Sequence, residues 1–111
     1  MNELDDKFRS VRRGLLEFAV LTVIATRASY AADILARLAA TDFATQEGTL
    51  YPLLGKLRRG ELLEYEWVES ETGPPRKYYH LTDDGKQHLS RLAAYWASLS
   101  TTIETLGAEP S

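Results

Sequence analysis

The sequence contains no cysteine, which excludes disulfide bonds, thiolate metal sites and cysteine nucleophiles. Long hydrophobic runs are also missing: the longest, FAVLTVIA at residues 18–25, is far shorter than the ~18 residues that a membrane span requires. The N-terminal segment MNELDDKFRSVRR begins with acidic side chains and has no early apolar stretch, so it lacks the pattern of a secretory signal. We therefore expect a soluble, cytoplasmic protein that does not contact a membrane.

Basic residues are too few to give a positive net charge, because 13 Lys and Arg are outnumbered by 16 Asp and Glu. The net charge of −3 argues against a general affinity for nucleic acid, so any such function must depend on where the basic side chains lie. The 111 residues, 44% of them hydrophobic, are sufficient for one domain with a real core. A domain of this size buries less of its surface than a larger one, which favours help from a second subunit.

Three helices are predicted in the first half of the chain. Residues 6–26 are apolar on most sides of a helix, which is typical of a helix that contacts another subunit as well as its own core. A second helix follows Ser29, which we expect to be its N-cap. The third helix should begin at residues 48–49, because Pro52 lacks the amide proton that a helix interior needs, and it should end at Gly60.

A β-hairpin is predicted next, because apolar and polar residues alternate over residues 63–67 and again over residues 77–81. Glycine and two prolines at residues 73–75 predict the turn between the two strands. Arg76 and Lys77 follow directly, so the hairpin should present two cations at a stiff, protruding tip. Such a tip suits a negatively charged partner.

A long helix should close the chain, with Thr82 as its N-cap. Its apolar residues are spaced alternately three and four apart, which is a heptad pattern and predicts a seam that packs on a second chain. Two residues of the first helix, Leu15 and Phe18, would form the other wall of this interface. The seam residues are Leu89, Leu92, Trp96, Leu99, Ile103 and Leu106.

The order helix, helix, helix, hairpin, long helix predicts a mostly α protein with a small β-hairpin, of the α+β class. This is the order of a winged helix-turn-helix followed by a long C-terminal dimerisation helix. Residues 1–82 would bind DNA, with the third helix in the major groove and the hairpin as the wing. Residues 83–107 would form the dimerisation helix of the same compact domain, and residues 108–111 a disordered tail.

Three motifs resemble the PadR family of bacterial transcriptional regulators: RRGLLEFAVL near the start, EGTLYPLLGKL in the third helix and GPPRKYYHLTDDG at the wing. They occur in the family's order and spacing, and the resemblance runs from about residue 11 to residue 96. It implies a homodimeric repressor that reads operator DNA with its third helix and wing and is often released by a small molecule. One departure is Ala31–Ala32, where the family usually has glycine and then an aromatic residue.

The resemblance places Thr49, Tyr51 and Lys56 on the DNA-facing side of the recognition helix, and Arg76 and Lys77 in the wing. Gln46, just before the helix, and Tyr78, just after the wing cations, are added to these. The candidate DNA-binding residues are therefore Gln46, Thr49, Tyr51, Lys56, Arg76, Lys77 and Tyr78. Simpler explanations stay open. The two wing cations can be ordinary solvated charges, and Tyr51 can lie over its own helix.

Trp96 suggests a second site. In a two-fold dimer its two copies would approach each other or the partner's first helix, and large flat rings near a symmetry axis pack imperfectly. A gap there, lined by Leu15, Phe18, Ala19 and Trp96, would suit a planar apolar or aromatic effector. Alternatively, Trp96 only fills the core of the dimer.

Other chemistry finds little support in the sequence. His80 closes a strand, so it cannot share a helical face with Asp84 and His88, and we expect no metal site. QEGTLYPLLGK lacks the glycine spacing of a phosphate-binding loop, and no Ser–His pair lies in a catalytic motif, so we expect neither an enzyme nor a cofactor. The remaining alternative is a winged-helix dimer that binds a protein instead of DNA. Salt dependence distinguishes the two, because DNA binding weakens steeply as salt rises.

Overall fold

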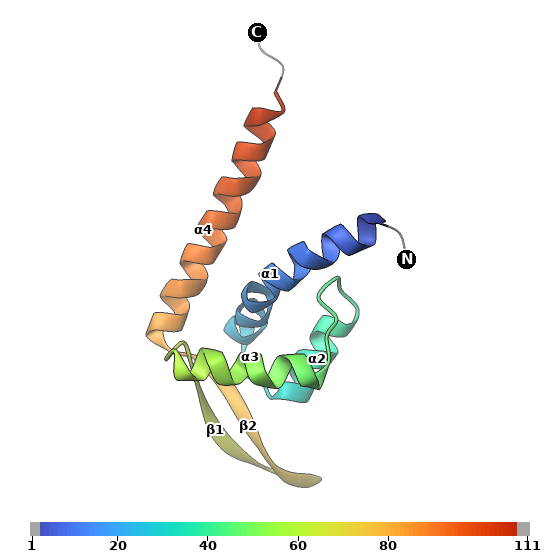
Figure 1. Cartoon of the computed structure of the whole chain (residues 1–111). Coiled ribbons are helices and arrows are strands. Elements are labelled where there is room, and N and C mark those ends of the chain that lie inside the picture. The colour runs from blue at the N-terminus through green and yellow to red at the C-terminus, as the bar shows by residue number, and fades with distance from the viewer. Residues whose placement is uncertain (1–2, 109–111) are drawn as a thin grey trace.

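The computed structural model describes residues 3–108, with side chains from residue 6 onward, as four helices and one hairpin (Figure 1). The elements are α1 (Glu3–Thr26), α2 (Ala31–Ala39), α3 (Glu47–Arg59), β1 (Leu63–Ser70), β2 (Gly73–Leu81) and α4 (Asp83–Leu106). This order confirms the predicted fold class, a winged helix-turn-helix with a long final helix. The predicted disordered tail falls largely on residues 109–111, which lie outside the described residues. No helix within the described part of the chain is long and apolar enough to cross a lipid bilayer.

The hydrophobic core lies where α1, α2 and α3 meet the hairpin. Helix α3 contributes Leu50, Leu54 and Leu57, all buried, as its apolar spacing predicted. The rest of the core comes from the second half of α1, one face of α2 and the strand ends nearest the helices: Val20, Leu21, Ile24, Ala31, Ile34, Leu38, Leu63, Tyr79 and Leu81. The far half of α4 adds nothing to this core and extends away from the other elements (Figure 1).

The predicted N-cap of α2 is wrong. Tyr30 occupies the N-cap position, and its side chain makes no capping hydrogen bond. Ser29 is buried and exchanges two backbone hydrogen bonds with Tyr79 of β2, at 3.0 and 2.9 Å. The Ser29 hydroxyl donates to the Arg27 carbonyl at 2.9 Å. Pairing with β2 therefore fixes Ser29 in extended backbone, and the helix begins two residues later.

Helix α3 begins at Glu47, slightly earlier than predicted, and includes Pro52. The proline removes the donor that the Gly48 carbonyl would have in a regular helix. Both residues are exposed, so water can hydrogen-bond to that carbonyl in place of the missing amide. The predicted C-terminal end of α3 is confirmed, because Gly60 is its C-cap. The left-handed backbone that often follows a helix belongs to the next residue, Glu61, with φ 63°.

The turn of the hairpin lies two residues earlier than predicted. Residues 71–72 form it, whereas residues 73–75 belong to β2 and Ser70 pairs with Gly73. A two-stranded sheet has only edge strands, and there a proline can face away from its neighbour without losing a ladder hydrogen bond. Arg76 and Lys77 are therefore strand residues set back from the tip, and the prediction of a cationic tip is wrong.

Thr82 joins the hairpin to α4. Its hydroxyl accepts a hydrogen bond from the Gly85 amide at 2.9 Å, which confirms the predicted cap, and donates to the Glu61 carbonyl at 2.7 Å. Gly85 is buried directly against Leu62, and a Cβ there would overlap the Leu62 carbonyl oxygen. These interactions hold the first turn of α4 against the segment between α3 and β1.

We expect Thr82→Ala to lower the free energy of unfolding by about 1–2 kcal/mol, because the variant can neither cap α4 nor donate to the Glu61 carbonyl. Thr101→Ala is the matched control, since it removes the same atoms from an exposed position in the last two turns of α4. Urea unfolding of both variants at one protein concentration measures the difference. Equal stabilities for the two variants would contradict a structural role for this hydroxyl.

Candidate nucleic-acid interface

The exposed arc of α3 lies opposite its buried leucines. Successive residues of a helix are about 100° apart, so Thr49 and Tyr51 lie at opposite edges of this arc. Pro52, Lys56 and Arg59 are exposed between the two edges. Helix α3 therefore presents a polar surface with one flank toward the hairpin and the other toward α1.

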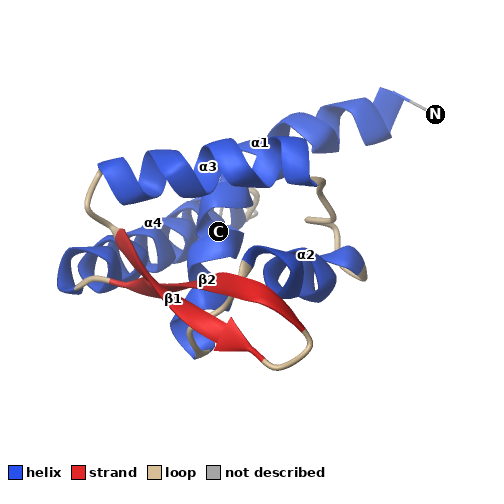
Figure 2. Ribbon diagram, turned by 90° about the horizontal axis from the view of Figure 1, so that it is seen from below, coloured by secondary structure: helices blue, strands red, loops and turns tan. Residues whose placement is uncertain are grey.

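The flank toward the hairpin borders a groove of about 470 Å³ between α3, the start of α2 and the hairpin. Figure 2 shows these three elements in one view. It brings together three predicted DNA-binding residues, Tyr51, Arg76 and Lys77. Tyr30 and Trp67 also line it, although no local signal in the sequence predicted this role for them. Further lining residues are Ala31, Ala32, Pro75 and Tyr79. The small Ala31–Ala32 pair leaves room beside Tyr30, where relatives are expected to carry an aromatic side chain.

Aromatic rings hold both wing cations. The Arg76 guanidinium carbon lies 4.4 Å from the centre of the Tyr30 ring. The Lys77 ammonium lies 4.6 Å from the Tyr65 ring centre and 5.3 Å from that of Trp67. Such contacts are attractive and restrict the motion of the cations. Arg76 is nevertheless exposed, so one side of its guanidinium remains accessible to an anion.

Tyr78 and Tyr79 have different environments, as the alternation of the strand predicted. Tyr79 is buried in the core, whereas Tyr78 is half-buried with its ring centre 5.2 Å from that of Tyr30. Tyr78 packs edge-on against the Tyr30 ring and is not among the residues that line the groove. Its predicted contact with DNA stays a prediction.

Burial raises the pKa of Tyr79 above its ordinary value of 10.0, and the nearby Tyr51 and Tyr65 hydroxyls raise it further. The Arg58 guanidinium acts in the opposite direction and lowers this pKa. The balance is a raised pKa, so the Tyr79 hydroxyl is neutral at physiological pH. The wall of the groove that it forms adds no negative charge beside Arg76 and Lys77.

The other predicted DNA-binding residues lie outside this groove. Gln46 is the N-cap of α3 and is exposed, and Lys56 is exposed on the helix surface. Thr49 lines a separate hollow on the α1 side, together with arginines of α1. The predicted residues of α3 are thus spread over its exposed arc, and among them Tyr51 alone lines the groove with the wing cations.

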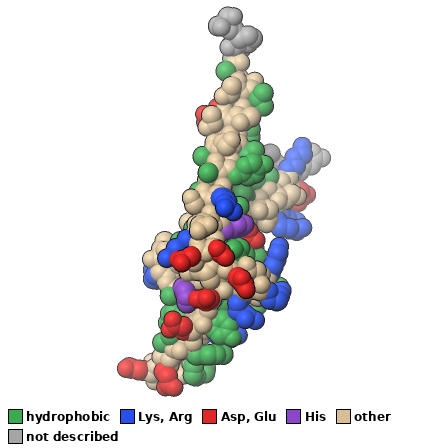
Figure 3. Space-filling model, turned by 90° about the vertical axis from the view of Figure 1, so that its left-hand side faces the viewer, with side chains coloured by type: hydrophobic (Ala, Val, Ile, Leu, Met, Phe, Trp, Pro, Cys, Tyr) green, Lys and Arg blue, Asp and Glu red, His purple; other side chains and the backbone are tan. Residues whose placement is uncertain are grey.

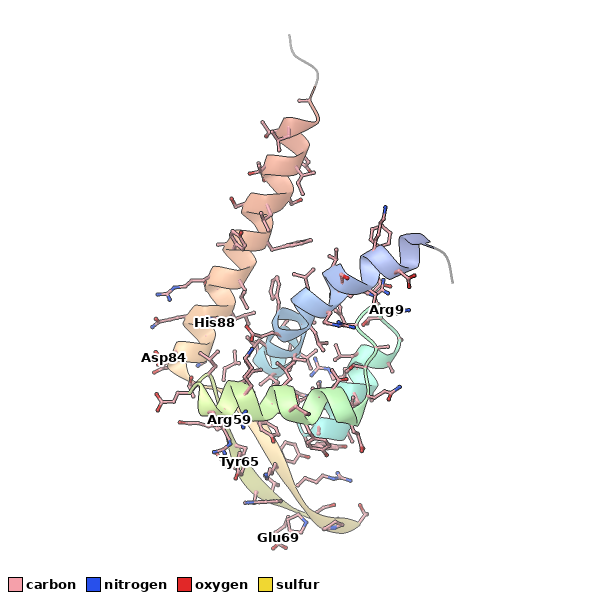
Figure 4. The ribbon with its side chains drawn as sticks, viewed as in Figure 1. Arg9, Arg59, Tyr65, Glu69, Asp84 and His88 are labelled. Carbon is pink, nitrogen blue, oxygen red and sulfur yellow. The ribbon has the colours of Figure 1, made fainter. Side chains whose placement is uncertain are left out.

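Acidic and basic side chains are partly segregated. Figure 3 shows Asp and Glu over the central and lower parts of the face in view, with most Lys and Arg along its right-hand edge and a few at its centre and left. Glu64, Glu66, Glu69 and Glu71 are all exposed on or beside β1, and Figure 4 shows Glu69 near the hairpin tip. The tip would therefore repel phosphates, and the basic part of the hairpin is its middle. This partial segregation makes the net charge of −3 compatible with a local basic surface.

A third hollow, which is apolar and has a volume of about 390 Å³, lies between α1 and α4. It brings together Leu15, Phe18 and Trp96, three of the four residues predicted to bind an effector. The fourth, Ala19, packs against the protein's own core and is not among the lining residues. The remaining lining residues include Val11, Leu92, Tyr95 and Leu99.

The predicted seam of α4 divides into two parts. Leu89 and Leu92 are half-buried against this chain's own core, because α1 packs beside the first turns of α4. Beyond them the seam is exposed: Trp96 is 47%, Ile103 69% and Leu106 80% accessible. Cover from its own chain therefore decreases along the seam and is least at Ile103 and Leu106.

The two histidines serve different elements. His88 Nε2 lies 3.0 Å from the Glu17 carboxylate and links α4 to α1, whereas His80 Nε2 lies 3.2 Å from Glu64 across the hairpin. Figure 4 shows His88 on the side of α4 that faces α1 and Asp84 at the start of that helix. In the described part of the chain, no three His, Asp or Glu side chains are arranged to hold a metal ion.

Comparison with known proteins agrees with this geometry. A PadR-like transcriptional regulator family model matches residues 20–91. A PadR-like transcription factor from Bacteroides fragilis has a similar solved structure, with 41% identity and a TM-score of 0.78, over 92% of this chain and 99% of that one. A PadR family regulator from Eggerthella lenta is 31% identical with a TM-score of 0.83, over 93% and 90% of the two chains.

A third solved structure, a PadR-like regulator from Bacillus cereus, is 34% identical with a TM-score of 0.77, over 87% of this chain and 96% of that chain. The family consists of transcriptional regulators, so the prediction that this protein is not an enzyme is confirmed. The family match covers most of the chain, including α2, α3 and the hairpin. The chain therefore belongs to the PadR-like family of transcriptional regulators.

Proposed function

We propose that the protein is a homodimeric repressor that acts in the cytoplasm and binds a near-palindromic operator. Residues 1–82 would bind the DNA and residues 83–107 would form the dimer. The observation that carries the proposal is the groove beside α3, where Arg76 and Lys77 are held over aromatic rings next to the exposed Tyr51. An α-helix fits the major groove of B-DNA, and the wing cations then meet the phosphates beside it.

The exposed outer seam of α4 supports a dimer, because contiguous apolar surface of this kind usually marks an interface. Two-fold symmetry would place two copies of α3 on one face of the DNA. We expect the operator half-sites to be centred ~10 base pairs apart, or a multiple of that, as one helical turn of about 34 Å requires.

We further propose that a small apolar or aromatic effector releases the repressor by binding in the hollow between α1 and α4. Trp96 and Leu99 belong to both the hollow and the seam, so a ligand there would contact the interface region directly. A ligand changes DNA affinity only when it favours one of two arrangements. The effector would therefore favour a spacing of the two α3 helices that does not fit the operator.

Arg76→Ala combined with Lys77→Ala tests the DNA proposal. We expect weaker binding to operator and to scrambled duplex by similar factors, because phosphate contacts position the protein without reading sequence. The slope of log affinity against log salt should become shallower by up to about 1.8, or ~0.9 for each phosphate that is no longer neutralised. Thr49→Ala and Tyr51→Ala should instead weaken the operator more than the scrambled duplex.

Lys86→Ala combined with Arg91→Ala is the matched control, since it removes the same charge from exposed positions on α4 that line neither hollow near α3. It should leave both affinities nearly unchanged. Fluorescence anisotropy at several salt concentrations measures all variants. If the wild-type protein binds no duplex at low salt, the alternative of a protein-binding winged-helix dimer replaces this proposal.

A further inference from the structure

A second basic surface lies on the flank of α3 that faces away from the wing. Arg9, Arg12 and Arg13 of α1 border a hollow of about 560 Å³ whose other walls include residues 42–45 and Thr49. Figure 4 shows Arg9 on α1 beside the loop that leads into α3. The proposed wing contacts make no use of this surface.

The side chains that line this hollow carry more positive than negative charge. Three guanidinium groups and one carboxylate, that of Asp42, border the hollow. Arg9 makes an exposed ion pair with Asp6 at 3.6 Å. For Arg12 and Arg13, no carboxylate among the described residues lies within ion-pair distance. Like charges three and four residues apart destabilise a helix slightly, so the cluster is a small cost to the isolated chain.

The position of the hollow relative to α3 indicates the partner. Tyr51, at one edge of the exposed arc, borders the wing groove, and Thr49, at the other edge, borders the arginine hollow. A helix in the major groove has a phosphate backbone on each side. If the wing contacts the phosphate backbone on one flank of α3, the second phosphate backbone lies on the other flank, beside Thr49. The arginine surface of α1 occupies that flank.

We propose that Arg12 and Arg13 bind the phosphate backbone on the side of the major groove opposite the wing, so that α3 is held between two sets of cations. The inference rests on the proposed DNA binding and extends it to α1. The partner is the sugar–phosphate backbone of the duplex that α3 reads.

The test is Arg12→Gln combined with Arg13→Gln, compared with Lys86→Gln combined with Arg91→Gln on α4. Operator affinity is measured by anisotropy at several salt concentrations. We expect the first pair to lower affinity by roughly tenfold to a hundredfold near 0.1 M salt and to reduce the salt slope by up to about 1.8, since two phosphates would keep their counterions. The control pair should change neither quantity appreciably. Hydroxyl-radical footprinting should show weaker protection at one backbone segment of each half-site.

Arg12→Lys combined with Arg13→Lys keeps the charge and should restore most of the salt slope. If the lysine variant loses as much affinity as the glutamine variant, the charge on phosphate is not the cause, and the inference is overturned. An unchanged slope in the glutamine variant, together with a reduced slope in the wing variant, also overturns it while DNA binding by the wing stands. Absence of DNA binding by the wild-type protein instead overturns the proposed function itself.

Discussion

Leu99→Glu combined with Ile103→Glu should convert the dimer to a monomer and lower operator affinity at least about a hundredfold, because each chain would then bind one half-site without the gain from linkage. Both side chains are exposed in the isolated chain and lie on the part of α4 that projects beyond the other elements (Figure 1). Packed against a second chain, they would place four carboxylates in an apolar interface, where unpaired charges are strongly unfavourable.

Sedimentation at micromolar concentration measures the assembly, and footprinting measures occupancy of the half-sites. Ala94→Glu combined with Thr101→Glu is the matched control, because it adds the same charge on the opposite face of α4, where both positions are exposed. We expect the control to stay dimeric. A wild-type protein that sediments as a monomer would remove the dimer from the proposal, since the outer seam would have no chain to pack on.

The order and type of the elements could be predicted because each has its own periodicity. The apolar spacing changes from helical to alternating near Leu63 and back to helical after Thr82, and the structure places its boundaries at the same points. The N-cap at Thr82 and the end of α3 at Gly60 could also be predicted from the sequence. These signals depend on residues within one or two turns, so no tertiary information was needed.

The errors share a different cause, which is pairing between distant segments. The sequence around Ser29 favours a cap, but hydrogen bonds to Tyr79 hold it in extended backbone. Residues 73–75 have the composition of a turn, but their register against β1 places them in the strand. The contact between Tyr30 and Arg76 likewise joins residues far apart in the chain and has no local signal.

The candidate site shows the same division. Residues on the exposed arc of α3 could be predicted because the buried leucines define the opposite face. The arginine surface could not, since it exists only where α1 crosses the loop before α3. Ala19 was predicted to line the effector site together with Phe18, but about 100° of helical rotation separates the two side chains, and Ala19 packs against the core.

A substitution at Trp96 can show whether the hollow between α1 and α4 is a ligand-binding site or a part of the dimer core that the partner chain fills. The hollow is lined mostly by apolar side chains, and three of its residues, Phe18, Tyr95 and Trp96, are aromatic. Flat apolar compounds fit such a site, because ring faces and edges contact each other favourably. A partner chain that packs on the outer seam would instead cover Trp96 and fill the same space with its own side chains.

Trp96→Ala separates these two cases. If the hollow binds an effector, the variant should remain dimeric, keep its operator affinity and lose at least about tenfold in affinity for planar aromatic compounds, since one ring of the site is missing. If Trp96 only fills the dimer core, the same change should lower the free energy of unfolding by about 3 kcal/mol or more and leave no ligand response to lose.

Isothermal titration calorimetry with planar aromatic compounds measures the ligand affinity of every variant, including those without Trp96. In the presence of Trp96, quenching of its fluorescence reports the site, in a Trp67→Phe background that removes the other emitter and keeps a ring near Lys77. Trp96→Phe is the conservative control and should keep most of the ligand affinity, because an aromatic face remains beside Phe18. Release of labelled operator by the same compounds then connects binding to regulation. Quenching of Trp96 fluorescence without operator release would show that a ligand binds in the hollow but does not favour one spacing of the two α3 helices over the other. The proposed effector role would then be wrong, although the binding site would stand.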